Sequence, residues 1–185
     1  MRKNTKIFNI PNVLTLSRIL LLPIFILGFY LQTKLGLFLS LSIFILCCIT
    51  DYLDGYVARA YNQTTELGKI LDPMADKILV FVSILCILEF DMVSKLALIP
   101  SSINICRDLI ITSLRNTVST SGKSFKTSYI AKCKTATQMI SISVIILSNI
   151  VSINEGIIFG EILLWISSII AIISGIKYFK TFINK

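Results

Sequence analysis

The chain contains no histidine, and only 15% of its 185 residues are charged. Without histidine, any general base must be a carboxylate, a lysine or a metal-bound group, and a serine–histidine–aspartate mechanism is excluded. The five cysteines are odd in number, form no Cys-x-x-Cys pair and fall within apolar stretches. We therefore interpret them as small packing residues and not as a redox or metal-binding set.

The chain is instead rich in hydrophobic residues, which form long apolar stretches. Hydrophobic residues make up 55% of it, and the mean hydropathy is +0.82, far from that of a soluble domain. Six apolar stretches are each about as long as a bilayer requires: residues 12–32, 35–60, 72–90, 95–119, 133–153 and 156–178. We predict an all-α integral membrane protein with six transmembrane helices, built as a single domain over residues 1–185 with a short basic segment at residues 1–11.

The basic residues give this arrangement an orientation. The net charge is +8, and when the N-terminus is placed inside, all but Lys34 and Lys95 of the 18 lysines and arginines fall on the inner side. The positive-inside rule then places both termini in the cytoplasm. Because the charge follows the membrane orientation, we do not expect the chain to bind nucleic acid.

An acidic stretch interrupts the apolar sequence and reads DYLDGYVARAYNQTTELGKILDPMAD. At about 100° per helical residue, two acids and two small residues share one face: Asp51, Asp54, Gly55 and Ala58. A second stripe, spaced four and four residues apart, contains Gly68, Asp72 and Asp76. Carboxylates this close to hydrocarbon are costly, and a bound divalent cation is the natural compensating charge. Two such faces turned toward each other would hold four carboxylates around divalent cations, with Arg59 able to reach a phosphate.

The start of the third span is ambiguous because Asp72 precedes Pro73. Asp72 could be the N-cap of a helix that begins there, with proline at its first position. Alternatively, the helix begins near Thr65 and Pro73 kinks it. The stripe of Gly68, Asp72 and Asp76 requires the second alternative, which we favour.

Two further groups of polar residues stand near the inner ends of the spans. Asn12, Thr15 and Arg18 lie at helical spacing, either as an interfacial helix end with a snorkelling arginine or as one wall of a polar pocket. Arg107 and Arg115 are about 80° apart on a helix, so they could flank one cavity. Alternatively, Arg107 pairs with Asp108 at the membrane interface and Arg115 is an anchor on the positive inner side. The basic loop that ends in Lys132 and Lys134 could touch anionic lipid heads or bind an anionic substrate.

The spacing D-x2-D-G-x2-A-R-x8-G-x3-D-x3-D is complete from Asp51 to Asp76 and resembles the signature of the CDP-alcohol phosphatidyltransferase family. The resemblance implies the fold of that family, a six-helix membrane protein that is usually a homodimer. The segments NIPNVLTLSR, LGKILDPMADK and KTATQM, together with Arg107–Asp108 and Leu114–Arg115, are similar to the branch of the family that forms phosphatidylglycerophosphate.

This branch implies a reaction in which CDP-diacylglycerol and sn-glycerol 3-phosphate give phosphatidylglycerophosphate and CMP. Two divalent cations, magnesium or manganese, are expected on Asp51, Asp54, Asp72 and Asp76, and Asp76 is also the implied catalytic base. The residues expected to bind CDP-diacylglycerol are Asn12, Thr15, Gly55, Ala58, Arg59 and Gly68. The residues expected to bind the phosphate of glycerol 3-phosphate are Arg107, Arg115 and Lys134, which suit a dianion.

Other functions remain open at this point. The same metal site could serve another acceptor, namely serine, inositol phosphate or phosphatidylglycerol, although the basic cluster argues against serine. A small cation transporter could also use intramembrane acids, but its site is expected near the bilayer midplane. The acids here lie at the cytoplasmic ends of the spans. We therefore expect an enzyme among membrane lipids, with its active site at the cytoplasmic face. The family resemblance implies that the membrane is the cytoplasmic (inner) membrane of a bacterium.

Overall fold

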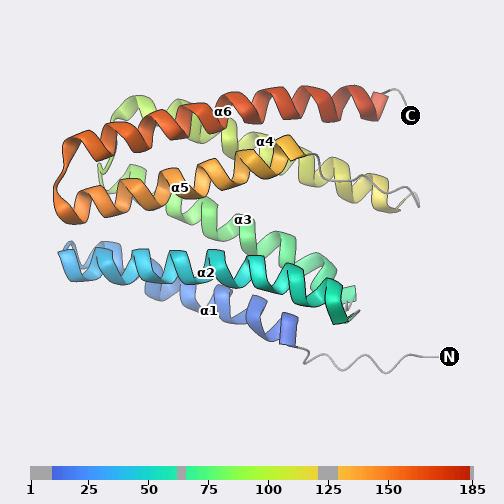
Figure 1. Ribbon diagram of the computed structural model, residues 1–185, viewed down its shortest axis with the longest axis horizontal. Coiled ribbons are helices and arrows are strands. Elements are labelled where there is room, and N and C mark those ends of the chain that lie inside the picture. The colour runs from blue at the N-terminus through green and yellow to red at the C-terminus, as the bar shows by residue number, and fades with distance from the viewer. Residues whose placement is uncertain (1–9, 62–65, 121–128, 184–185) are drawn as a thin grey trace. The chain divides into compact units, whose positions relative to one another are not determined.

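The computed structural model of the protein describes the backbone of residues 10–61, 66–120 and 129–183, and the side chains of residues 16–51, 74–75, 77–114 and 129–180. This part of the chain is helical and contains no strand. Its elements are α1 (Ile10–Tyr30), α2 (Lys34–Tyr61), α3 (Glu66–Glu89), the short 3-10 helix η1 (Lys95–Ala97), α4 (Leu98–Thr120), α5 (Tyr129–Val151) and α6 (Asn154–Ile183). The predicted all-α class is confirmed, and each predicted span overlaps one α-helix (Figure 1).

The helices have the length and composition of membrane spans. Within the described residues, four segments are long and apolar enough to cross a bilayer: Lys34–Asp51, Lys95–Leu114, Tyr129–Val151 and Asn154–Lys180. A shorter apolar segment covers Leu16–Tyr30. Only 28% to 33% of each long segment is buried within the chain, so most of its apolar surface is left for lipid. The protein is therefore a membrane protein, while the number of helices that cross and their orientation stay predictions.

The course of α3 settles how this helix begins. It starts at Glu66 and continues without interruption through Pro73 to Glu89. The alternative with Asp72 as an N-cap is wrong, and the predicted start near Thr65 is confirmed, while the kink at Pro73 stays a prediction. Gly68, Asp72 and Asp76 therefore lie on successive turns of one helix, as the spacing requires.

Chain contacts divide the molecule into two compact units, residues 1–86 and 87–185. In the first unit, α1 and α2 run side by side (Figure 1). Phe25 is fully buried between them, with its ring centroid 5.1 Å from that of Phe29 and 6.4 Å from that of Phe44. The Ser40 hydroxyl donates to the Phe25 carbonyl at 2.8 Å. The pair is therefore held by an aromatic cluster and by a hydrogen bond between the helices.

Small residues allow the closest approach of α1 and α2. A Cβ atom added at Gly28 would lie 2.6 Å from the Gly36 carbonyl oxygen and would overlap the Ser40 hydroxyl. The turn between the helices places Gln32 in the left-handed region, with a φ of 48°. Lipid tails are as apolar as the side chains, so the hydrophobic effect does little to bring helices together in a bilayer. Van der Waals contact at small residues holds them together instead.

The second unit contains η1, α4, α5 and α6. Here α6 packs along α5 and also contacts α4. The Ser141 hydroxyl of α5 donates to the Gly160 carbonyl of α6 at 2.7 Å, and the Asn104 amide of α4 donates to the Ser167 hydroxyl of α6 at 2.9 Å. Hydrogen bonds thus link α6 to both neighbours and form the frame for the polar cluster described below.

The tight packing at Gly28 gives a first prediction. Gly28→Ala should lower the apparent melting temperature of the detergent-purified protein, because overpacking at a close contact typically costs about 1–3 kcal/mol. The measurement is a thermal melt followed by fluorescence. Gly175→Ala adds the same methyl group where the nearest atom, Arg107 Cγ, is 3.6 Å away, so it should be tolerated. Equal melting temperatures for the two variants would contradict the proposed packing.

Candidate functional site

A partly buried ion pair joins α1 and α2. Arg18 Nη1 on α1 lies 2.9 Å from Asp51 Oδ1 on α2, and Arg18 Nε donates to the Thr50 hydroxyl at 3.3 Å. The Arg18 side chain is 3% exposed, whereas that of Asp51 is 36% exposed. A snorkelling arginine would extend toward water, so the structure favours the polar wall over the interfacial anchor.

This ion pair is a contact of a predicted site residue that the motif alone did not reveal. Arg18 lies outside the acidic signature, yet it holds one oxygen of the first predicted metal ligand. The signal in the sequence was the helical spacing of Arg18 with Asn12 and Thr15. That spacing indicated a polar face but could not identify Asp51 as the residue it meets.

The backbone places the other candidates of the first unit on regular helices. Asp54, Gly55, Ala58 and Arg59 follow Asp51 within α2, as the shared helical face requires. The side chains of nine predicted residues lie outside the described residues: Asn12, Thr15, Asp54, Gly55, Ala58, Arg59, Gly68, Asp72 and Asp76. Within the side chains that the structure does describe, no three metal-ligating groups come together. Because three of the four predicted ligands fall outside that set, the metal site stays a prediction.

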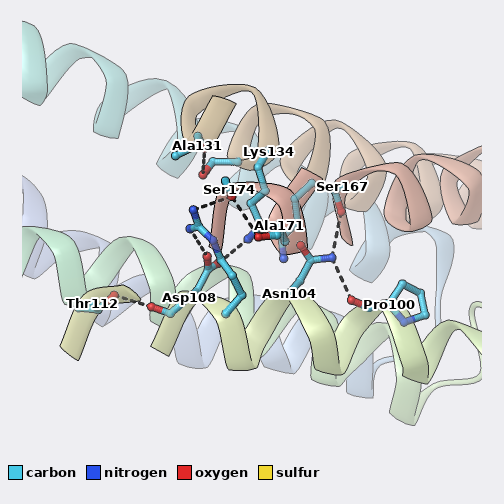
Figure 2. A network of polar contacts seen from close by, with 12 residues as sticks. Pro100, Asn104, Asp108, Thr112, Ala131, Lys134, Ser167, Ala171 and Ser174 are labelled. Carbon is cyan, nitrogen blue, oxygen red and sulfur yellow. Dashed lines mark hydrogen bonds and ion pairs between the residues drawn. The ribbon is translucent and has the colours of Figure 1, made fainter. Parts of the chain in front are cut away.

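A polar cluster in the second unit is centred on a carboxylate between two cations. Asp108 Oδ1 accepts from Arg107 Nη1 at 3.1 Å, and Asp108 Oδ2 accepts from Lys134 Nζ at 2.5 Å (Figure 2). Arg107 and Asp108 are neighbours on α4, while Lys134 lies on α5. The structure thus brings together two of the three residues predicted to bind the acceptor phosphate. The side chain of the third, Arg115, lies outside the described residues.

Neighbouring helices hold these two cations in place. Arg107 Nη2 donates to the Ser174 hydroxyl of α6 at 2.8 Å, and the guanidinium carbon lies 5.8 Å from the centroid of the Tyr178 ring, within cation–π range. Lys134 Nζ also donates to Gln138 Oε1 at 2.6 Å, one turn further along α5. Lys134 is fully buried, so its long side chain is confined to one position.

The charges and donors of the cluster are of the kind that binds an anion. Among the described residues of the cluster, two side-chain cations stand against one carboxylate, which gives these three side chains together a net positive charge in a largely buried place. A guanidinium and an ammonium held together suit the oxygen atoms of a phosphate group. The Arg107–Asp108 pair that the sequence suggested is present, but it is part of this larger arrangement and includes Lys134. The contact between Asp108 and Lys134 was missed, and so were Gln138 and Ser174 as members of the cluster. The four-residue spacing of Lys134 and Gln138 could have indicated one of these contacts.

Comparison with known proteins gives a consistent result over most of the chain. Residues 8–173 match the family described as CDP-alcohol phosphatidyltransferase. A Rickettsia felis protein named CDP-diacylglycerol–glycerol-3-phosphate 3-phosphatidyltransferase is 40% identical over 176 residues, covering 93% of this chain and 94% of its own. A protein of the same name from Wigglesworthia glossinidia brevipalpis is 43% identical, covering 92% of this chain and 93% of its own. Another from Escherichia coli K12 is 40% identical, covering 74% of this chain and 75% of its own.

The buried position of Lys134 gives a second prediction. Asp108→Leu should lower the apparent melting temperature strongly, because leaving a buried charge without its partner costs about 3–5 kcal/mol. Adding Lys134→Met to that variant should restore much of the loss, since no buried ammonium then remains. Glu155→Gln, at an exposed carboxylate on α6, is the control and should melt as the wild type does. A double variant no more stable than Asp108→Leu would show that the two charges are not coupled.

Proposed function

We propose that this chain, which belongs to the CDP-alcohol phosphatidyltransferase family, transfers the phosphatidyl group from CDP-diacylglycerol to sn-glycerol 3-phosphate. The products are phosphatidylglycerophosphate and CMP. The observation that carries this proposal is the match to relatives of that name over more than nine tenths of both chains. The complete acidic signature from Asp51 to Asp76 lies within the matched region.

The acidic residues fit a pair of divalent cations by their chemistry. Asp51 and Asp54 lie on consecutive turns of α2, and Asp72 and Asp76 on consecutive turns of α3. Carboxylate oxygens are the ligands that Mg²⁺ and Mn²⁺ prefer. Asp51 also remains 36% exposed while it pairs with Arg18. When bound, the cations would supply positive charge beside the pyrophosphate of the donor and the departing CMP.

The remaining residues of the signature take roles around the donor. Gly55 and Ala58 leave the backbone of α2 open to the cytidine diphosphate, and Arg59 contacts a phosphate. Gly68 lets α2 and α3 approach each other, and Asn12 and Thr15 of α1 line the donor site. Asp76 acts as general base and takes the proton from the glycerol hydroxyl that attacks phosphorus, since the chain has no histidine for this purpose.

The acceptor is held by the basic cluster of the second unit. Arg107 and Lys134, with Arg115 further along α4, bind the phosphate of glycerol 3-phosphate. The support for this assignment is the net positive charge around Asp108 and the burial of Lys134. A site of this charge suits a phosphorylated acceptor and disfavours serine. Inositol phosphate is the alternative that has the same chemistry.

The proposed reaction also defines where the enzyme works. A water-soluble acceptor and an acyl-bearing donor meet only at a membrane surface, and the positive-inside rule assigns the acidic signature to the cytoplasmic side. We place the protein in the bacterial cytoplasmic membrane, surrounded by lipid and assembled as a homodimer.

The third prediction concerns the acceptor. Purified protein in detergent, supplied with CDP-diacylglycerol and Mg²⁺ or Mn²⁺, should release CMP with sn-glycerol 3-phosphate but not with serine, inositol, inositol phosphate or phosphatidylglycerol. The match between two fixed cations and a phosphate dianion disfavours serine, inositol and phosphatidylglycerol. The names of the relatives favour glycerol 3-phosphate over inositol phosphate. CMP release is followed by chromatography, with Asp54→Ala as the blank and a metal-free sample as a second control.

The other results of this acceptor panel distinguish the metal site from the acceptor pocket. Release with a different acceptor would retain the metal site and remove the assigned acceptor pocket. Absence of release with every acceptor, from folded protein that still binds divalent cations, would support a cation transporter instead.

The fourth prediction separates the base from the metal ligands. Asp76→Asn should reduce turnover by at least about 100-fold, the lower range for loss of a general base, while binding of CDP-diacylglycerol stays close to that of the wild type. Donor binding is measured by calorimetry in detergent at saturating Mg²⁺. Asp51→Asn is the comparison variant and should weaken cation binding. Loss of donor binding in Asp76→Asn would mean that Asp76 serves mainly as a metal ligand.

A further inference from the structure

Gln138 is a buried amide that the proposed reaction has not yet used. It lies on α5, its side chain is 1% exposed, and its carbonyl oxygen accepts from Lys134 Nζ at 2.6 Å. An ammonium group has three donors and no acceptor, so the amide must turn its oxygen toward Lys134. The two N–H groups of Gln138 therefore point away from the lysine. Among the described residues, this nitrogen has no hydrogen-bond partner.

A second donor in the same cluster is also unused. Arg107 Nε is buried and has no partner within the described part of the chain, although both Nη atoms of this guanidinium are bonded. Buried donors without a partner are rare in proteins, because burial removes their hydrogen bonds to water and no protein hydrogen bond replaces them. Two of them beside a net positive charge indicate a ligand that accepts hydrogen bonds and carries negative charge.

We propose that Gln138 is a further acceptor-binding residue, whose amide nitrogen donates to a phosphate oxygen of the acceptor while its carbonyl oxygen holds Lys134. Arg107 Nε is the second donor to the same phosphate. This inference rests on the proposed function and extends it, because it adds a neutral donor to the cationic residues. The phosphate is the partner because the adjacent charges attract it more strongly than a glycerol hydroxyl.

A purely positioning role makes a different prediction from direct binding. If Gln138 only held Lys134, a carboxylate in its place would do so at least as well, since it would accept from the ammonium. If the amide nitrogen binds phosphate, that carboxylate removes the donor and repels the anion. Gln138→Glu therefore separates the two roles, and Gln138→Met removes both polar groups at nearly constant volume.

The experiment measures steady-state CMP release by full-length protein in detergent, with sn-glycerol 3-phosphate varied at saturating CDP-diacylglycerol and Mg²⁺. Both variants should raise the KM for glycerol 3-phosphate by about tenfold or more, as expected for loss of a hydrogen bond to a charged group. The KM for CDP-diacylglycerol should stay within about threefold of the wild type. The inhibition constant of inorganic phosphate, competing with the acceptor, should rise in parallel.

The control is Asn149→Leu, which removes another amide from the same helix about three turns away. Asn149 already donates to the carbonyls of Met92 and Ile145, so its loss should affect stability and leave the KM for glycerol 3-phosphate unchanged. Melting temperatures of all variants are recorded alongside. If Gln138→Met does not fold, Gln138→Glu, which retains the bond to Lys134, decides the question alone.

The outcomes separate this inference from the proposed function. Wild-type protein that releases no CMP with glycerol 3-phosphate would contradict the function, and calorimetric binding of inorganic phosphate to wild type and variants would still test Gln138. A functional wild type with a Gln138→Glu variant of unchanged KM and phosphate inhibition would overturn the inference and leave the function in place.

Discussion

The constraint on which the second unit depends is the buried ammonium of Lys134. A cation inside a membrane protein must be compensated, and the compensation here comes from Asp108 on α4 and Gln138 on α5 itself. Asp108 in turn engages Arg107, which reaches Ser174 on α6. One buried charge thus links three helices through a chain of polar contacts (Figure 2). The same contacts fix the positions of the two cations that we propose bind the acceptor phosphate.

Small polar residues make this arrangement compatible with a lipid environment. Hydrocarbon on the outside of the helices removes most of the hydrophobic force that would otherwise drive them together. Buried serines compensate by bonding to backbone carbonyls, as Ser40 does with Phe25 and Ser141 does with Gly160. These bonds require close helices, and glycine at the crossing points permits that distance. Close helix packing is therefore what allows the buried serine hydroxyl groups to form their hydrogen bonds.

Much of the fold and part of the site were predictable from local pattern. Apolar length indicated each α-helix that the structure describes, and the stripe of Gly68, Asp72 and Asp76 favoured the early start of α3 over the N-cap alternative. The acidic spacing also led to the family. That Arg18 meets Asp51 and that Lys134 meets Asp108 was not predictable, because each of these partners lies on another helix. Helical periodicity specifies the side on which a residue lies, but it does not specify which helix meets that side.

The sequence by itself determined the class of protein, the helical segments, the expected orientation and the acidic signature, because these depend on composition and on spacing within single helices. Only the tertiary structure decided that Arg18 is buried against Asp51, that Asp108 bridges two cations, and that Gln138 keeps an unused donor beside Lys134. The physical reason is that the cost of a buried polar group depends on every group around it. Those neighbours come from distant parts of the chain and are known only when the helices are packed.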